Sequence, residues 1–364
     1  MADNNQNEAR NIISPDDEEL RKFVENLKVS IKIVGCGGGG SNTINRLFDS
    51  GIIGTELIAV NTDAQHLLRV KANKKILIGK RLTKGLGAGA DPRIGEMAAQ
   101  ETDEELRNAL SKTDILFITA GMGGGTGTGS APYVAKIARE INPGVLIIGV
   151  VTLPFSAEGK LRMDQALYGL DRLRRYCDTT IVIPNDKLLE YVPKLPLDQA
   201  FKVADEILMV ALKGLTEIIT KPGLVNIDFA DIKTIMKDAG IAMIGIGESD
   251  DSHNRVEEAV QEAINSPLIE ADIKDAKGAL VRVVGDPHMS VSEAQKAAEI
   301  IQKNISPNAR LIWGASIDPE LEDVIRVLIV LTGVKSPYVI GQKGENMQDL
   351  TKKVSKLNAD IDNI

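Results

Sequence analysis

The 364-residue chain has a formal net charge of −8, with 43% hydrophobic and 3% aromatic residues. This length favours two domains, and an acidic chain with so few aromatic rings argues against a nucleic-acid partner. No apolar run approaches the roughly 18 residues that span a bilayer, and Met1–Asn5 does not begin a signal peptide, so we expect a cytoplasmic protein without direct membrane insertion.

Cysteine and histidine usage gives no sign of a disulfide or a metal centre. Cys36 and Cys177 are too few and too far apart for a disulfide framework or a thiolate metal site. The histidines His66, His253 and His288 show no metal-ligand spacing.

Residues 1–29 are predicted to form an extension that contains a short amphipathic helix. Ser14 suits the N-cap position and Pro15 the first turn. The apolar stripe of this helix consists of Leu20, Phe23, Val24 and Leu27. We expect the helix to pack on the body of the protein, because acidic residues offset its few basic ones and argue against a membrane helix.

Between residues 30 and 196, short apolar runs alternate with stretches of helical periodicity. Strands are expected at 31–34, 57–60, 75–79, 115–120, 145–151 and 180–183, and helices at 43–48, 94–102 and 158–176. This alternation is typical of βαβ units and a parallel sheet, in which ligands bind at the carboxyl ends of the strands. We therefore predict an α/β domain over 30–196.

Three glycine-rich segments follow these strands, at 35–42, 85–92 and 121–132. In the third, six of the nine residues from Gly121 to Gly129 are glycine, and each costs about 0.5–1 kcal/mol relative to alanine in ordered structure. A helix is expected next, with Thr128 or Ser130 as N-cap and Pro132 in its first turn. Strand, glycine segment and helix N-terminus together make an anion site, so we expect the segments to meet at one edge of the sheet and to bind phosphate.

Residues 197–223 carry the longest helical pattern, with apolar residues over most of its circumference. This pattern predicts a central connecting helix buried on several sides. Residues 226–231 are expected to form the loop that follows, at the start of a smaller α/β domain over 224–335. Its strands are expected at 242–247, 279–284, 310–314 and 326–331, and its helices at 256–265 and 291–304. The tail, 336–364, ends in a polar stretch, Gln348–Ile364, for which a weakly held helix is expected.

The glycine segments permit more than one nucleotide. The first fits the G-x-G-x-x-G pattern of dinucleotide-binding domains, so an NAD-dependent oxidoreductase is one interpretation. Dinucleotide-binding domains usually carry an acidic residue at the end of the second strand, where it binds a ribose hydroxyl. This chain has Asn61 and Thr62 at that position, and Glu56 lies at the start of the strand. Neither principal segment carries the G-K-[ST] of a P-loop, so main-chain N–H groups, helix N-termini and a magnesium ion must neutralise the phosphates. The pattern favours a nucleoside triphosphate held by main chain.

Seven motifs in order give the chain its resemblance to the tubulin/FtsZ family of GTPases, over about residues 30–335. The most specific is Gly123–Gly129, with the sequence GGGTGTG. The others are Gly38–Asn42, Asn61–Gln65, Gly87–Pro92, Pro154–Arg162, Pro184–Leu189 and Asn226–Asp231. The resemblance implies a Rossmann-like GTP-binding domain with a parallel sheet, joined by a long central helix to a smaller α/β domain.

The resemblance also implies that the chain binds GTP or GDP and assembles head to tail. In that reading the glycine segments cradle the phosphates, Glu158 and Arg162 lie at the ribose and phosphates, Asn185 and Asp205 bond the guanine edge, and Phe201 stacks on its face. The remaining nucleotide-binding residues that it implies are Gly37, Gly38, Gly39, Gly40, Ser41, Asn42, Asn61, Ala88, Gly89, Ala90, Gly123, Gly124, Gly125, Thr126, Gly127, Thr128 and Gly129.

The catalytic residues implied by the resemblance are Asp228, Asp231 and Asn226, which act on the nucleotide of the neighbouring subunit. Assembly then switches hydrolysis on, and head-to-tail contacts that do not close give filaments. Without the resemblance, the acidic pair is a solvated loop, and Glu158 with Arg162 is a surface ion pair. Mg²⁺ is the implied metal, with Asp63 as its one candidate ligand.

In a cell, the resemblance implies a division-ring GTPase at mid-cell, with membrane-adaptor and regulatory division proteins as partners. Two departures stand out: the chain stops at Ile364 without the long linker and adaptor-binding peptide that family members often carry, and Asp91 replaces a frequent asparagine.

The other alternative is a structural filament in which GTP is a static cofactor. Intact Asp228 and Asp231 argue against it.

Overall fold

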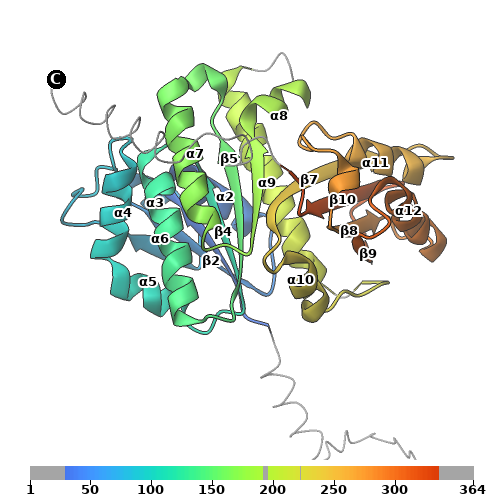
Figure 1. Cartoon of the computed structure of the whole chain (residues 1–364), viewed down its shortest axis with the longest axis horizontal. Helices are drawn as coiled ribbons and strands as arrows, with labels where there is room; N and C mark the ends of the chain where they lie inside the picture. The colour runs from blue at the N-terminus through green and yellow to red at the C-terminus, as the bar shows by residue number, and fades with distance from the viewer. Residues whose placement is uncertain (1–28, 192–195, 222, 336–364) are drawn as a thin grey trace, which may run out of the picture.

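The structure, a computed structural model, describes residues 29–191, 196–221 and 223–335. The predicted N-terminal helix and the tail 336–364 lie outside these residues. The described chain forms one ten-stranded sheet in the order β3-β2-β1-β4-β5-β6-β7-β10-β8-β9. Helix α9 lies between the two halves of the molecule (Figure 1).

The first six strands are parallel, as predicted from the alternating apolar runs. They are β1 (Ile31–Cys36), β2 (Thr55–Asn61), β3 (Lys74–Leu77), β4 (Ile115–Gly121), β5 (Leu146–Leu153) and β6 (Thr179–Pro184). β1, β5 and β6 are buried along their whole length because helices cover both faces of the sheet. All six predicted strands are confirmed.

Two helical layers enclose this half. One face packs against α2 (Gly37–Asp49), α3 (Ala64–Arg69), α8 (Asn185–Tyr191), α9 (Leu197–Thr220) and α10 (Phe229–Met236). The other packs against α4 (Pro92–Glu101), α5 (Asp103–Leu110), α6 (Gly125–Ile141) and α7 (Lys160–Arg174). Because every strand end here leads into a helix or a turn, the carboxyl edge of the sheet is where loops gather.

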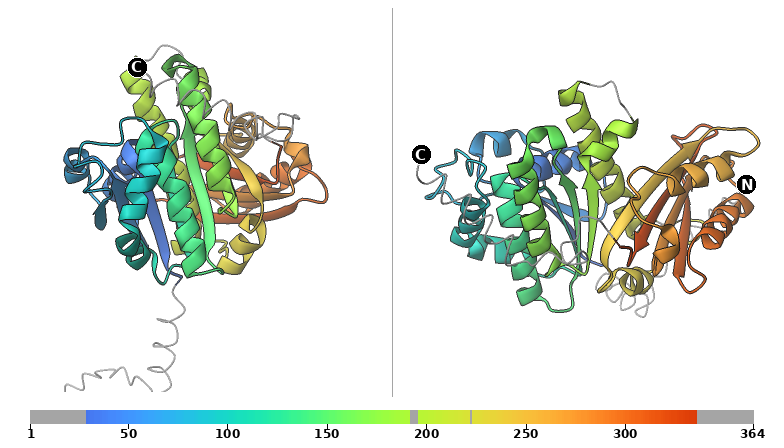
Figure 2. Two further views of the ribbon diagram at one scale, coloured as in Figure 1. Left: turned by 60° about the vertical axis from the view of Figure 1, so that its left-hand side comes forward. Right: turned by 45° about the horizontal axis from the view of Figure 1, so that its top comes forward.

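The C-terminal half continues the same sheet. β7 (Gly240–Ser249) pairs with β6 in parallel over three residues, and β10 (Ile325–Thr332) is antiparallel to both β7 and β8 (Gly278–Gly285). β9 (Arg310–Ile317) is the last strand, and α11 (Arg255–Ile264) and α12 (Val291–Asn304) build a third core on the outer face. Figure 2 separates this half, coloured yellow to red, from the blue and green half. The predicted domain boundaries remain a prediction.

The central helix α9 has the bounds Leu197–Thr220, within the predicted 197–223. Leu208, Ala211, Leu212 and Leu215 are buried against the sheet and belong to the core that both halves share. A helix buried between two layers needs apolar residues around most of its circumference, which is the pattern that its sequence shows.

Three expected boundaries are wrong. Helix α2 begins at Gly37, six residues before the predicted start at 43, so most of the first glycine segment lies inside the helix. Helix α6 starts at Gly125, with Gly124 as N-cap, so Thr128 and Ser130 are not caps and Pro132 lies inside the helix rather than in its first turn. The reason is packing: a side chain at Gly129 would overlap the Pro92 carbonyl oxygen, so the glycines let α6 approach α4 along its first turns.

The loop predicted at 226–231 is also shorter than expected, because Phe229–Asp231 already belongs to α10. Asp228 caps this helix: its Oδ1 accepts the Asp231 N–H at 2.8 Å. Helices α3, α5, α8 and α10 are missing from the sequence prediction, since helices of six to eight residues are too short to show a clear apolar period.

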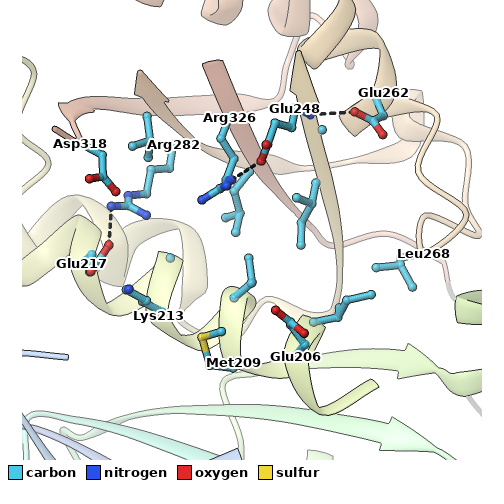
Figure 3. A pocket seen from close by; sticks show the side chains of 17 residues that line it. Glu206, Met209, Lys213, Glu217, Glu248, Glu262, Leu268, Arg282, Asp318 and Arg326 are labelled. Atoms are coloured by element: carbon cyan, nitrogen blue, oxygen red, sulfur yellow. Dashed lines mark hydrogen bonds and ion pairs between the residues drawn. The ribbon is translucent and has the colours of Figure 1, made fainter. Parts of the chain in front are cut away.

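A cavity of about 440 Å³ lies between α9 and strands β7, β8 and β10 (Figure 3). Across it, Arg282 donates to Glu217 Oε2 at 2.7 Å, and both side chains are nearly buried, at 12% and 6% exposure. Burial lowers the pKa of Arg282, and Glu217 offsets this only in part. Lys221 bonds the other Glu217 oxygen at 2.7 Å.

We predict that Arg282→Met lowers the free energy of unfolding by about 2–4 kcal/mol, because it leaves a buried carboxylate with one partner fewer. The matched control is Arg326→Met, since Arg326 pairs with Glu248 at 2.6 Å in the same cavity but both side chains are well exposed. It should cost less than about 1 kcal/mol. Urea unfolding measures both, and equal losses would contradict the difference in burial.

Candidate functional site

The three glycine segments meet at the carboxyl edge of the sheet, as predicted. A Cβ atom at Gly37 would lie 2.6 Å from the Gly127 nitrogen, and one at Gly125 would lie 2.8 Å from the Asp91 nitrogen. The first turn of α2, the first turn of α6 and the segment before α4 are therefore in backbone contact. Neither α2 nor α6 has an acidic residue in its first turn, so the positive ends of both helix dipoles are unopposed there.

The glycines fall into two groups. Gly35, Gly40 and Gly129 have no room for a side chain, because protein backbone occupies the place of a Cβ. Gly38 and Gly124 face open space, with no atom within 4 Å of an added Cβ. Packing alone does not require glycine at the second pair, which leaves room for a ligand to approach the main chain there.

We predict that Gly38→Ala and Gly129→Ala fail in different ways. Gly38→Ala should keep the melting temperature within a few degrees and weaken GTP binding at least tenfold, because the methyl group occupies the place of a phosphate. Gly129→Ala should lower the stability by about 2 kcal/mol or more, because α4 and α6 must move apart. Thermal melts and GTP titrations separate the two, and full GTP affinity in Gly38→Ala would remove Gly38 from the site.

The segment before α4 is held in an unusual backbone conformation. Gly87, Gly89 and Ala90 have φ values of 92°, 58° and 61°, and Ala90 adopts this left-handed conformation without being glycine. Ala88 is buried between them. Such strain persists where the surroundings impose it, which is common at ligand clamps.

Asp91 ends this segment as the N-cap of α4. Its carboxylate accepts the Arg93 N–H and pairs with the Arg93 guanidinium at 2.8 Å. Burial alone would raise the pKa of Asp91, but the hydrogen bonds and charge of Arg93 hold it below its usual value. The aspartate that replaces the family's frequent asparagine at position 91 therefore forms a local ion pair with Arg93.

At the other end of the site lie Asn185, Phe201 and Asp205. Asn185 is buried, and its Oδ1 has no hydrogen-bond partner among the described residues. A buried amide oxygen without a partner is costly, so it marks a place for a ligand donor. Phe201 is partly exposed and meets Phe155 edge-on, with ring centroids 5.1 Å apart.

Asp205 lies two turns into α9. Burial raises its pKa to about 6, and Arg46, whose Nε is 4.0 Å from Oδ2, and Asn42 offset this only in part. A perturbed carboxylate in a ligand site is a candidate functional group. Hydrogen-bond donors of a ligand would stabilise its charged form.

Glu158 and Arg162 form the ion pair that their spacing of four residues suggested, at 2.9 Å. Glu158 Oε1 also accepts the Phe155 N–H, so the carboxylate holds the turn after β5. Arg162 lies against the third glycine segment, because a Cβ at Gly123 would be 2.8 Å from the Arg162 Cγ. The pair is therefore beside the phosphate end of the site.

Asn61, Asp63 and Thr126 lie around the end of β2. Thr126 Oγ1 is 2.6 Å from Thr62 Oγ1, which joins α6 to this strand end. Asp63 Oδ1 accepts the His66 N–H at 2.9 Å and so caps α3. In the part of the chain that the structure describes, no cluster of three His, Cys, Asp or Glu side chains could cage a metal.

Sequence reasoning missed His66. Its Nδ1 lies 2.9 Å from Asn61 Nδ2 and its Nε2 lies 3.0 Å from Asn42 Oδ1, between two predicted ligand residues. The only signal was its place in the segment after the second strand, three residues behind Asp63. The ring takes part in hydrogen bonds between side chains, which metal-ligand spacing does not reveal.

The predicted catalytic residues are not in this site. Asn226, Asp228 and Asp231 are exposed beyond the C-terminal end of α9, whereas Asp205 is near its start. The 15 residue-to-residue steps from Asp205 to Thr220 span about 22 Å of helix at 1.5 Å per residue. The structure therefore does not bring the acidic pair and the glycine segments of one chain together.

Comparison with known proteins gives matches over both halves. Residues 30–193 match the Tubulin/FtsZ family, GTPase domain, and residues 240–335 match the FtsZ family, C-terminal domain. Cell division protein FtsZ 1 of Pyrococcus furiosus is 58% identical over 323 residues, covering 89% of this chain and 86% of that protein. The relative from Methanocaldococcus jannaschii is 55% identical over 324 residues, covering 89% and 88%.

Solved structures of related proteins have a similar fold. The FtsZ dimer from M. jannaschii has a TM-score of 0.83 and 55% identity, covering 88% of this chain and 92% of that one. CetZ2 from Haloferax volcanii, solved as a GTPγS-bound protofilament, has a TM-score of 0.72 at 20% identity, covering 92% and 100%, and shares the fold. No helix of the described residues is both long and apolar enough to cross a membrane.

Proposed function

The chain belongs to the tubulin/FtsZ family and is a GTPase, and from this premise we propose that it hydrolyses GTP where two copies meet head to tail, in filaments that form the division ring. One observation carries the shared site. The acidic pair of α10 follows the C-terminal end of α9, whereas Asp205, which contacts Asn42 of the first glycine segment, is near the start of α9, and the helix between Asp205 and Thr220 is about 22 Å long. A second copy, stacked end to end, would bring its acidic pair to the glycine segments of the first.

The glycine edge would hold the nucleotide. The main-chain N–H groups at Gly38 and Gly124 would face the phosphates, since both positions are open, and the segment Ala88–Ala90 would close over the γ-phosphate. Arg162 adds a positive charge beside them, in the absence of a P-loop lysine. A site built of N–H groups and dipoles is fixed before the charge develops, and phosphoryl transfer needs this more than covalent chemistry.

Asp205 and Asn185 would select guanine. A carboxylate accepts from the N1 and N2 donors of guanine, and adenine presents no such pair. Asn185 Oδ1, which has no partner within the described part of the chain, can take a further donor. Phe201 would cover the face of the base. Burial of these groups makes the penalty for a wrong base large, since polar groups would stay unpaired.

The second copy would provide the acidic pair. Asp228 and Asp231, with Asn226 beside them, polarise the attacking water and orient it toward the γ-phosphate. Because head-to-tail contact does not close, assembly gives filaments, and each new contact completes one site.

Magnesium would assist by neutralising phosphate charge when it is bound. Mg²⁺ usually keeps several waters and takes one or two carboxylates besides the phosphates, which fits a site without a protein cage. We retain Asp63 as the candidate ligand, although its Oδ1 already caps α3.

Membrane-adaptor and regulatory division proteins, and a mid-cell location, belong to the same proposal. The NAD-dependent alternative does not survive the family assignment. A filament with GTP as a static cofactor remains the second candidate.

The experiment is phosphate release from GTP with magnesium over a series of protein concentrations. Under the shared-site proposal, activity per molecule rises from near zero above a threshold at which the protein also sediments. A rate per molecule that is flat with concentration would overturn it, and no turnover in sedimenting protein would favour the static filament.

A further inference from the structure

Four side chains from four elements form one hydrogen-bonded chain beside the base end of the site. Asn61 at the end of β2 contacts His66 of α3 at 2.9 Å, and His66 contacts Asn42 of α2 at 3.0 Å. Asn42 Nδ2 donates to Asp205 Oδ2 of α9 at 3.4 Å. The chain ends on the carboxylate that the proposed function assigns to guanine.

Both ends of this chain fix the direction of its hydrogen bonds. Asn61 Oδ1 accepts the Asp63 N–H at 3.3 Å, so Nδ2 of that amide faces His66 and donates to Nδ1. At the other end the Asp205 carboxylate can only accept, so Asn42 turns its Nδ2 there and its Oδ1 toward His66.

These two constraints leave one arrangement for the imidazole ring. Nδ1 must accept and Nε2 must donate, which describes the neutral tautomer with its proton on Nε2. His66 therefore donates to Asn42, and its own backbone N–H is tied to the cap of α3. The ring is held from both sides.

The anchoring affects one oxygen of the carboxylate. Among the described residues, the contacts of Asp205 from Asn42 and Arg46 both fall on Oδ2. Contacts on Oδ2 restrain the rotation of the carboxylate and leave Oδ1 without a contact of this kind to Asn42 or Arg46. Asn42 is itself exposed, so without a partner on its oxygen its amide would rotate freely.

We propose that His66 is a positioning residue for base recognition: it orients Asn42, which orients the Asp205 carboxylate toward the N1 and N2 donors of guanine. This inference rests on the proposed function of Asp205. His66 touches neither the base nor the reacting atoms, so it sets specificity and affinity rather than the rate of phosphoryl transfer.

The test compares kcat/KM for GTP with that for ITP, which lacks the 2-amino group of guanine, in variants matched to the ring nitrogens. His66→Gln places an amide near the position of Nε2 and should keep the donor to Asn42. His66→Asn reaches only the position of Nδ1 and should lose it. His66→Ala loses both, and Arg69→Ala on the exposed side of α3 is the control.

We expect the preference for GTP over ITP to fall at least fivefold in His66→Ala and His66→Asn, through KM, with kcat at saturating GTP within twofold of wild type. His66→Gln and Arg69→Ala should keep the preference. In a background that carries Asn42→Ala, His66→Ala should cause no further loss, because the two act in series.

Three results would overturn the proposal: an unchanged preference in His66→Ala, equal losses in the Gln and Asn variants, or additive losses with Asn42→Ala. If His66→Ala does not fold, the Gln and Asn pair decides. If the wild type itself shows no preference for guanine, the proposed function of Asp205 fails, whereas a wild-type preference that every His66 variant keeps rejects only the role of His66.

Discussion

Asp231→Ala is expected to lower the rate of GTP hydrolysis at least 100-fold while GTP affinity stays within about twofold of wild type. The side chain is exposed in the first turn of α10 and lies far from the glycine segments of its own chain. Its loss removes the group that polarises water for the neighbouring copy and no group that binds nucleotide. Single-turnover phosphate release and titration with a slowly hydrolysed GTP analogue measure the two quantities.

A control must separate catalysis from general loss of acidic charge. Asp250→Ala removes an exposed carboxylate after β7 and should leave both quantities unchanged. Exposed substitutions of this kind usually change stability by less than about 0.5 kcal/mol, so melting curves should coincide. If Asp231→Ala keeps full turnover, or loses GTP binding, the assignment of Asp231 is wrong.

The second large effect is a dependence of GTP affinity on pH. In the free protein burial raises the pKa of Asp205 to about 6, and donors of guanine favour the charged carboxylate. Binding therefore lowers this pKa and releases a proton below about pH 6. Affinity should rise with pH up to about 6 and level off above it, and it should be about tenfold weaker at pH 5 than at pH 8.

The phosphates of GTP also titrate near pH 6, so the comparison needs Asp205→Asn. That variant keeps the contribution of the phosphates and should lose the rest of the pH dependence, with weaker binding at pH 8. Calorimetric titrations in two buffers of different ionisation enthalpy count the protons. Identical pH profiles for the two proteins would show that Asp205 does not face the base.

The raised pKa of Asp205 also predicts how the stability of the folded protein depends on pH. A carboxyl group whose pKa is raised on folding favours the folded state while it is protonated, and this contribution is lost as pH rises from about 4 to about 6. Bound guanine nucleotide should restore stability above pH 6, because the charge then has donors. The carboxylate thus costs stability in the free protein and is useful only with ligand present.

Much of the fold was predictable because its strands are buried on both faces. Continuous apolar runs such as Val145–Val151 identify such strands without an alignment, and the helical period of α9 gave its bounds closely. The meeting of the glycine segments followed from parallel topology alone. The roles assigned to Asp228 and Asp231 came from the family resemblance and remain predictions.

The sequence did not reveal what depends on contacts between distant residues. Whether Gly129 serves packing and Gly38 serves a ligand is decided by what lies opposite each, and both look alike in the chain. The start of α6 was misplaced because glycine is a poor helix former by propensity, and here close contact with α4 outweighs that cost. His66 acts through Asn42, 24 residues away, and no local pattern signals that pairing.

The most direct test of the shared site mixes two inactive variants. Asp231→Ala binds GTP but cannot complete its neighbour's site. Gly38→Ala keeps Asp228 and Asp231 but binds GTP at least tenfold more weakly, so the GTP concentration is chosen to load only Asp231→Ala. In an equal mixture that sediments together, random stacking would place an intact acidic pair against a GTP-loaded copy in about a quarter of contacts, so about a quarter of the wild-type rate should return. A mixture that assembles but hydrolyses no faster than the sum of the separate variants would contradict a site built by two copies.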